Sequence, residues 1–242
     1  MSMVLQRDKW LQYQALSSVP LLIGRLPETQ LLEKDTLHHM LQQHSRVVLK
    51  PRDGRYGRDI VFIRRLKTGN YQIQNENKAI TMKNTEELEK WIDQTDKNHT
   101  YIIQQHLYLA SIQQRPLDLR IMVQRKKKAS SAWKVTGSYA KVASRGYLVT
   151  NVTNRTIPAL RALQSARIGG RKLLLQAERT ALLGAKALEM RYPDLRQVGF
   201  DIGVDNKARI WIIEGNYRPD LRPFKRLKDS SMYRRILWYQ NH

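Results

Sequence analysis

The sequence contains no cysteine, which excludes a disulfide framework and a metal site built from thiolates. It also lacks any apolar run of about 18 residues, so it predicts no membrane span. Its first ten residues, MSMVLQRDKW, contain no apolar core of the kind found in signal peptides. Because no export signal is seen, the cytoplasm is the expected location of the chain.

Acidic residues are scarce, with 21 Asp and Glu against 43 Lys and Arg, and the formal net charge is +22. Such a charge predicts affinity for polyanions, such as nucleic acid, polyphosphate or an anionic surface. The basic residues are densest at 125–128 (RKKK) and 222–228 (RPFKRLK), where Phe224 is the one aromatic residue that could stack on bases. Because we find no zinc-finger spacing, RNA-recognition motif or internal repeat, we favour non-specific polyanion affinity over dedicated nucleic-acid recognition.

The chain has 242 residues, 41% of them hydrophobic, which is enough for a globular core in one or two domains. Predicted helices lie at 7–19, from Glu28 or an Asp35 cap to His44, at 84–95, at 171–192 with Leu174, Ala181, Ala185 and Leu188 on one face, and at 229–240. Predicted strands lie at 46–51, 59–65, 71–75, 100–107, 117–126 and 133–144. Because these elements are interspersed without regular βαβ alternation, they favour an α+β fold with antiparallel sheets.

A predicted hairpin at residues 199–219 (GFDIGVDNKARIWIIEGNYRP) has acidic and amide groups within its two apolar strands. A turn at Asp205–Ala208 would place Val204 opposite Arg209. Side chains alternate along a strand, so one face of the hairpin should be apolar. The residues expected on that face are Phe200, Ile202, Val204, Trp211 and Ile213.

The other face of this hairpin should carry the polar groups. The same register puts Asp201 opposite Ile212, with Glu214 as its diagonal neighbour and Asn216 further along the strand. Two close carboxylates repel each other, and a hard cation such as Mg²⁺ resolves this with carboxylate and carbonyl oxygens as ligands. On this stretch alone, a magnesium site and a hairpin with a solvated outer face are equally good interpretations.

The stretch LKPRDGRYGRDIVFI (49–63) adds a second signal. It places Lys50 at the end of a strand, followed by a loop that contains Gly54 and Gly57. Glycines let backbone N–H groups approach phosphates, and a lysine adds a point charge. No helix or GK[ST] follows, so the loop is not a Walker P-loop. It predicts phosphate binding upstream of a magnesium-type hairpin.

A third signal is the strand YIIQQHL (101–107) followed by RPLDLRIMV (115–123). An apolar strand that ends in polar residues can offer its backbone to an adenine edge. Asp118 could accept hydrogen bonds from ribose hydroxyls, and Arg120 could hold a phosphate or a developing acyl-phosphate charge. Each residue taken singly also fits an ordinary strand end or a surface ion pair.

These pieces, in this order, resemble the ATP-grasp fold, and specifically the YheC/YheD family of endospore coat-associated proteins. The resemblance covers about residues 7–225 and rests on DKWLQYQAL (8–16), LPET (26–29), TLHHML (36–41), VVLKPRDGRYGRDI (47–60), YIIQQHL (101–107), RPLDLRIMVQ (115–124), VTGSYAKVASRGYLVTN (135–151) and the hairpin sequence. It implies a single ATP-grasp domain over 1–242, with two α+β lobes that grip ATP and no separate N-terminal pre-grasp domain. The expected lobes are 20–106 with the glycine loop and 107–225 with the metal site, followed by a basic C-terminal helix at 226–242.

The resemblance also implies roles for individual residues. Nucleotide contacts fall on Lys9, Lys50, Gly54, Gly57, Gln104, Gln105, Leu107 and Asp118; catalytic positions on Arg120, Lys141 and Asn151; and Mg²⁺ ligands on Asp201, Glu214 and Asn216. Asn154 and Arg155 stand where the family pattern has a glycine pair, and Lys141 stands where it has an arginine. These departures leave catalysis and acceptor binding open.

The implied activity is that of an ATP-dependent carbon–nitrogen ligase. Such an enzyme phosphorylates a carboxylate and lets an amine displace the phosphate, which depends on positioning and charge neutralisation. The alternative is a nucleotide-binding or structural spore-coat protein without catalysis, and a third is a polyanion-binding protein. Coat association would place the chain with coat-protein partners, while its carboxylate and amine substrates are not specified by the sequence.

Overall fold

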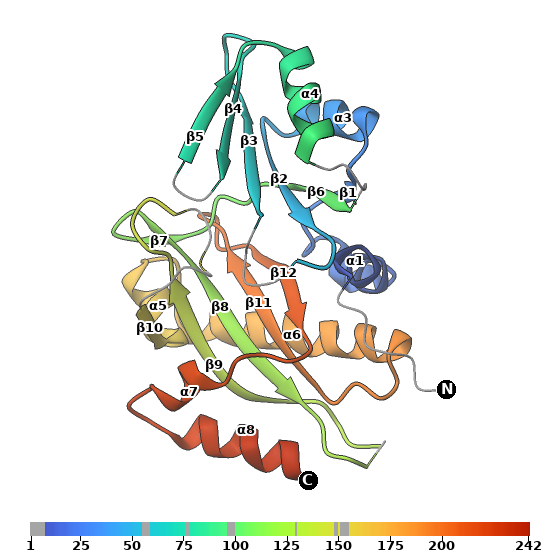
Figure 1. The fold of residues 1–242 in the computed structure, drawn as a ribbon. Helices are drawn as coiled ribbons and strands as arrows, with labels where there is room; N and C mark the ends of the chain where they lie inside the picture. Colours follow the sequence, from blue (N-terminus) through green and yellow to red (C-terminus); the bar gives the residue numbers. More distant parts are fainter. Residues whose placement is uncertain are drawn as a thin grey trace. The chain divides into compact units, whose positions relative to one another are not determined.

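The computed structural model describes residues 8–54, 59–75, 78–95, 100–128, 130–147, 150 and 155–242. The fold is α+β, as expected, and the chain divides into two compact units (Figure 1). The N-terminal unit holds Pro27–Leu107 and the start of helix α1 (Lys9–Ser17), up to Tyr13. The C-terminal unit holds Gln14–Leu26 and Tyr108–His242. No helix among the described residues is both long and apolar enough to cross a membrane.

The N-terminal unit is an antiparallel sheet with helices packed against it. Its elements are β1 (Thr29–Leu31), α3 (Lys34–Gln43), β2 (Arg46–Pro51), β3 (Val61–Arg65), β4 (Tyr71–Asn75), β5 (Lys78–Met82), α4 (Thr85–Thr95) and β6 (Tyr101–Gln105). Within the described ranges the strand order is β1-β6-β2-β3-β4-β5. The predicted strands at β2, β3, β4 and β6 are confirmed, whereas β1 and β5 were not expected from the sequence. Strand β1 has three residues and β5 is largely exposed, so neither shows an alternating apolar pattern.

The core of this unit lies between the sheet and helices α3 and α4, which are on the same side of it (Figure 1). Helix α3 begins with a capping box in which the Glu33 side chain accepts the N–H of Thr36 and the Thr36 hydroxyl accepts the N–H of Glu33. The expected start at Asp35 was therefore wrong by two residues. The buried core residues are Leu32, Leu37, Met40, Leu41, Val47, Leu49, Val61, Ile63, Tyr71, Ile73, Leu88, Ile92, Tyr101 and Ile103.

The C-terminal unit is built on a second antiparallel sheet. Its elements are α2 (Pro20–Ile23), β7 (Ser111–Ile112), β8 (Arg115–Gln124), β9 (Lys134–Val142), β10 (Arg155–Pro158), α5 (Ala159–Ser165), α6 (Arg171–Arg191), β11 (Gln197–Val204), β12 (Ile210–Asn216), α7 (Arg222–Lys225) and α8 (Ser231–Asn241). Among the described residues the strand order is β10-β9-β8-β11-β12, with β7 paired to β8. The long helix, the basic C-terminal helix and the strands β8, β9, β11 and β12 were predicted.

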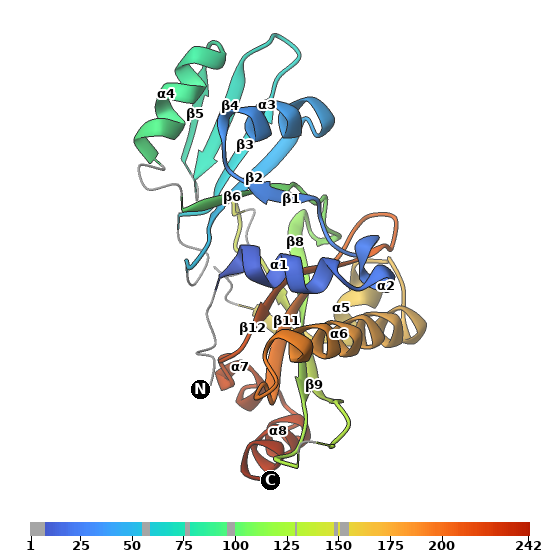
Figure 2. The same cartoon turned by 90° about the vertical axis from the view of Figure 1, so that its right-hand side faces the viewer.

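One face of the second sheet is covered by α5 and α6, which lie side by side (Figure 2). Gly184 of α6 allows a close approach, because a Cβ at this position would lie 2.9 Å from Cζ of Phe200. Of the four residues expected on one face of this helix, Ala181, Ala185 and Leu188 are buried. Leu173 is buried in place of Leu174, so the prediction was wrong only for the first residue of this face.

The opposite face changes character along the strands. At one end Met122 and Tyr139 pack against Phe224 and Ile236 from the α7–α8 segment. Phe224 is fully buried and its ring packs edge-on against Tyr139, with centroids 4.7 Å apart. The expectation that Phe224 could stack on bases is therefore wrong. Further along the same face, the strands carry the charged residues described next.

A charged face on the second sheet

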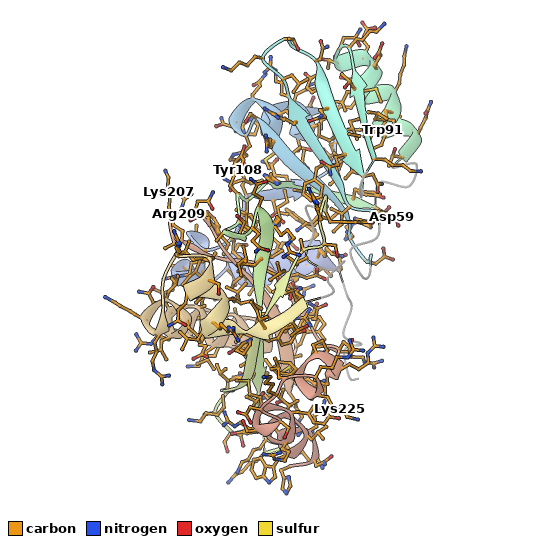
Figure 3. The ribbon with its side chains drawn as sticks, turned by 90° about the vertical axis from the view of Figure 1, so that its left-hand side faces the viewer. Asp59, Trp91, Tyr108, Lys207, Arg209 and Lys225 are labelled. Atoms are coloured by element: carbon orange, nitrogen blue, oxygen red, sulfur yellow. The ribbon has the colours of Figure 1, made fainter. Side chains whose placement is uncertain are left out.

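The turn between β11 and β12 is longer than expected. The carboxylate of Asp205 accepts the N–H groups of Lys207 and Arg209 at 2.8 and 2.9 Å, and the side chains of both residues lie at this turn in Figure 3. Although burial alone would raise it, these N–H groups and the Trp211 indole hold the pKa of Asp205 below its usual value. Because the turn runs to Arg209, Val204 lies opposite Ile210, and the expected Val204–Arg209 pair is wrong.

A β-bulge follows in the same hairpin. Ile202 lies opposite Ile212, and the register then shifts so that Asp201 lies directly opposite Glu214. The expected Asp201–Ile212 pair is therefore wrong, and the two carboxylates are direct rather than diagonal partners. Cross-strand partners share a face, so Ile210 and Ile212, in place of Trp211 and Ile213, lie on the face of Ile202 and Val204.

The hairpin completes a row of side chains across four strands. Tyr139 of β9, Arg120 of β8, Asp201 of β11 and Glu214 of β12 are successive cross-strand partners. In the adjacent row, Lys141 is the partner of Asp118. Because partners in register share a face, all of these polar side chains lie on the sheet face opposite α6.

Four of these residues form what we call the charge cluster: Asp118, Arg120, Lys141 and Asp201. The Nε and Nη2 of Arg120 donate to Oδ1 and Oδ2 of Asp201 at 2.7 and 3.2 Å. The Nζ of Lys141 lies 3.0 Å from Oδ1 of Asp201 and 3.2 Å from Oδ2 of Asp118. All four side chains are buried, and their two positive and two negative charges compensate one another.

Asp201 has its acceptor capacity filled by protein donors. Besides Arg120 and Lys141, the Nδ2 of Asn216 lies 3.3 Å from Oδ2 of Asp201. Each carboxylate oxygen therefore accepts two hydrogen bonds, which is its usual capacity. Although burial would raise it, Arg120 and Lys141 hold the pKa of Asp201 below its usual value. A cation could bind Asp201 only by replacing one of these donors, and the long contact to Asn216 is the weakest.

Asp118 has capacity that the described residues do not fill. Its Oδ2 accepts the hydroxyl of Thr150 and pairs with Lys141, whereas its buried Oδ1 accepts no hydrogen bond within the described part of the chain. Burial raises the pKa of Asp118 to about 6, against the opposing effect of Lys141. An unfilled buried acceptor beside an ion-pair network fits a ligand hydroxyl group.

The outer end of the row is more open than the cluster. Glu214 is only partly buried, and its carboxylate has no hydrogen bond or ion pair among the described residues. Asn216 uses its Nδ2 towards Asp201 and the Gly199 carbonyl, which directs its Oδ1 elsewhere. The chain as described contains no group of three or more His, Cys, Asp or Glu side chains arranged for a metal ion. One carboxylate and one amide oxygen still fit Mg²⁺, which keeps water or phosphate oxygens at its other positions.

The N-terminal unit places the other predicted residues around β2 and β6. Lys50, buried near the end of β2, donates to Oε1 of Gln104 at 2.5 Å. The Nε2 of Gln104 donates in turn to the hydroxyl of Thr29 at 2.8 Å. The backbone N–H of Gln105 donates to the Glu28 carbonyl at 2.8 Å, and Leu107 lies two residues beyond the end of β6. Lys50 and Gln104 thus form a buried polar chain that the sequence did not reveal as a pair.

Lys9 contacts the loop that follows β2. Its Nζ donates to the carbonyls of Pro51 and Gly54, each at 2.9 Å. Two further predicted site residues, Gly57 and Asn151, lie outside the described residues, and so does Asn154. Arg155, the other departure from the family pattern, begins strand β10.

Comparison with known proteins identifies similar sequences. The family model described as YheC/D-like ATP-grasp matches residues 5–241. The endospore coat-associated proteins YheD and YheC of Bacillus subtilis (strain 168) are each 24% identical to this chain, over 229 and 230 residues. These matches cover 88% and 91% of the chain but 48% and 62% of the relatives, so the chain spans about half to three fifths of their length.

Solved structures with the same fold include two enzymes. A biotin carboxylase from Campylobacter jejuni, in a complex with β,γ-ATP, has a TM-score of 0.62 and 15% identity, covering 98% of this chain and 47% of that one. An ADP complex of the N5-carboxyaminoimidazole ribonucleotide synthetase purK has a TM-score of 0.59 and 16% identity, covering 89% and 45%. At these identities the likeness shows the fold, and it confirms the fold expected from the sequence.

Proposed function

This chain belongs to the YheC/D-like ATP-grasp family, and from that premise we propose that it binds ATP together with Mg²⁺. The observation that carries the proposal is the direct pairing of Asp201 with Glu214. Like charges directly across a sheet destabilise it unless a cation compensates them. Arg120 and Lys141 compensate Asp201, whereas Glu214 has no cationic partner among the described residues. A bound divalent cation would supply the missing charge.

Mg²⁺ would be held mainly by Glu214 and the Oδ1 of Asn216. Asp201 would join as a ligand by exchanging its contact with the Asn216 amide, which at 3.3 Å is long. When bound, the ion would neutralise phosphate charge. The arrangement keeps Arg120 and Lys141 paired with Asp201, so the positions of both cations are fixed.

The proposed nucleotide contacts are those that the resemblance to the ATP-grasp family implies. Lys50, Lys9 and the backbone of Gly54, with Gly57, would bind phosphate oxygens. Gln104, Gln105 and the backbone to Leu107 would meet the adenine edge. Asp118, with its unfilled buried Oδ1, would accept a ribose hydroxyl.

The proposed reaction is carboxylate–amine ligation. A carboxylate oxygen of the acceptor takes the terminal phosphoryl group of ATP, ADP leaves, and the amine then displaces phosphate to form an amide. Arg120 and Lys141 would stabilise the negative charge that develops during transfer, with Asn151 as a third catalytic position. No side-chain nucleophile is required.

A second candidate function is a nucleotide-binding structural protein of the spore coat. The observation in its favour is that Asn154 and Arg155 replace the expected glycines, together with the names of the relatives from Bacillus subtilis. In this case coat proteins would be its partners and the coat its location. Non-specific polyanion affinity from the high net charge is compatible with either function.

The functions separate in one experiment. The melting temperature of the purified chain is measured in Mg²⁺ with increasing ATP. Separate, unheated samples are assayed for ADP release with a panel of carboxylates and amines. ATP binding raises the melting temperature by mass action, with about 2.7 kcal/mol of stabilisation at 100 times the Kd. ADP release that requires both a carboxylate and an amine supports the ligase. ATP binding without ADP release supports the structural protein. An unchanged melting temperature at millimolar ATP would contradict both functions.

A further inference from the structure

The carboxylate of Asp8 joins the start of helix α1 to the loop after β2, of which residues 52–54 are described. Asp8 precedes α1, and its Oδ1 accepts the N–H groups of Trp10 and Leu11 at 2.8 and 3.2 Å. These are the contacts of an N-cap, which satisfy backbone donors at the first turn of the helix. Asp8 therefore fixes where α1 begins.

The same carboxylate pairs with Arg52, in the loop after β2. The Nε of Arg52 lies 3.1 Å from Oδ2 and 3.3 Å from Oδ1 of Asp8, and its Nη2 also contacts Oδ2. Although burial alone would raise it, Arg52 and the N–H groups of Leu11 and Trp10 hold the pKa of Asp8 below its usual value. Asp8 thus stays ionised across the neutral range and binds both segments at once.

Lys9 adds three contacts to the same loop. Its backbone N–H donates to the Arg52 carbonyl at 2.9 Å, and its Nζ donates to the carbonyls of Pro51 and Gly54. The loop is tight at this point, because a Cβ on Gly54 would lie 2.9 Å from the Cβ of Pro51. An ammonium has three N–H donors, so the two carbonyl contacts leave one for an anion.

We propose that Asp8 and Arg52 are positioning residues, which hold the loop after β2 and the ammonium of Lys9 in one arrangement for an anionic phosphate group. This inference rests on the proposed binding of ATP. The carbonyls of Pro51 and Gly54 are neutral, so they direct the Lys9 charge without cancelling it. By contrast, the guanidinium of Arg52 is committed to Asp8, and Arg52 acts through Lys9 and the loop backbone.

The physical basis of this role is preorganisation. A loop that must be ordered on binding costs affinity, and a loop already fixed in its bound form avoids that cost. Loss of this preorganisation should weaken binding of the phosphate part of a nucleotide and should leave binding of the nucleoside part unchanged. This difference separates a positioning role from a general effect on folding.

The test compares the wild type with Asp8→Ser and Arg52→Gln. Serine keeps an N-cap oxygen but is too short to pair with Arg52, so it removes the ion pair and preserves the helix start. We expect each variant to weaken ATP binding about tenfold or more and to leave adenosine binding unchanged, as measured by calorimetry. The double variant should be no weaker than either single variant, because both remove one interaction. Equal losses for ATP and adenosine, or no loss for ATP, would overturn the inference.

A matched control is Asp93→Asn, which breaks the exposed Lys34–Asp93 pair of the same unit and should change neither affinity. A second measurement needs no nucleotide. Amide hydrogen exchange at Lys9 and Gly54 should accelerate at least tenfold in Asp8→Ser and Arg52→Gln and stay unchanged in Asp93→Asn. If the wild type binds no ATP, the proposed function fails, and unchanged exchange at these amides would separately overturn the link between Asp8 and Arg52.

Discussion

The charge cluster of the C-terminal unit and the loop after β2 of the N-terminal unit use their cations in different ways. In the cluster, Arg120 and Lys141 are buried against carboxylates, and the net charge is zero. In the loop, the ammonium of Lys9 is held by two backbone carbonyls. No carboxylate pairs with Lys9 among the described residues.

This difference predicts which property a substitution will change. Removing one partner of a buried ion pair strongly destabilises the fold, because the other charge is left buried and uncompensated. A cation held by neutral carbonyls keeps its full charge for a ligand. We therefore expect changes in the cluster to act first on folding, and changes around the loop to act first on phosphate binding.

The largest effect should come from Asp201→Asn. The change keeps the side-chain volume but leaves Arg120 and Lys141 buried without their shared carboxylate. We expect a loss of about 3–5 kcal/mol in the free energy of unfolding, measured by urea denaturation. The control is Glu214→Gln, on the partner strand, which should cost less than about 0.5 kcal/mol because it breaks no described contact. Similar losses of unfolding free energy for both variants would contradict the different roles assigned to the charge cluster and to Glu214.

A pH effect of intermediate size should come from His106, which is partly buried in the N-terminal unit. Burial, followed by the charges of Arg46 and Lys50, lowers the pKa of His106 to about 4. The unfolded chain then binds more protons between pH 6.5 and 4, so stability falls as the pH is lowered through this range. From pH 7 to pH 5 we expect His106 to account for a loss of about 2 kcal/mol, which His106→Gln should remove. Identical pH dependence of the two proteins would contradict this assignment.

Asp118 should have the opposite effect to His106 on the pH dependence of folding stability. Its pKa is raised to about 6, so the folded chain holds the proton more tightly, and stability falls as the pH rises from about 4 to 6. NMR titration of labelled aspartate carboxyls checks the direction. A carboxyl of Asp118 that titrates below pH 4 would show that Lys141 outweighs burial.

A smaller effect on folding is expected for Lys50→Met. The change leaves Oε1 of Gln104 without its donor, which should cost about 1 kcal/mol. Because a phosphate-binding charge is lost, ATP affinity should fall much more, by at least tenfold. A large loss of stability with normal ATP affinity would place Lys50 with the structural residues.

The smallest effect on stability should come from the exposed basic residues of the C-terminal unit. Figure 3 shows Lys225 at the surface of α7, and Arg234 and Arg235 are exposed on α8. The exposed ring of Trp238 has the ammonium of Lys126 over it, 4.8 Å from its centroid, and it stacks on the ring of His242. Arg234→Gln with Arg235→Gln should leave the melting temperature unchanged and reduce the salt dependence of polyanion binding. A sequence-selective complex that persists at high salt would contradict simple electrostatics.

The sequence predicted the fold well where a pattern was strong and local. A β-branched run that ends at a proline located β2, alternating apolar residues located β3 and β4, and the motif order indicated the ATP-grasp fold. The hairpin register could not be predicted, because a bulge between Asp201 and Ile202 shifts it by one residue without a sequence signal.

The candidate site was predicted as a set of residue types, and its pairing was not. That Arg120 and Lys141 share Asp201 depends on neighbours from three strands far apart in sequence. The Asp8–Arg52 pair joins residues 44 positions apart and likewise has no local pattern. Such contacts arise from tertiary packing, which spacing along the chain does not encode.

The most direct test of the central claim is a calorimetric titration with ATP in Mg²⁺ and in EDTA, for the wild type and Glu214→Gln. We predict that the wild type binds ATP more tightly in Mg²⁺ by at least tenfold. The Glu214→Gln protein should stay folded, because this side chain has no described partner, and should lose that magnesium dependence. Equal magnesium dependence in the two proteins would contradict a cation site at Glu214 and Asn216.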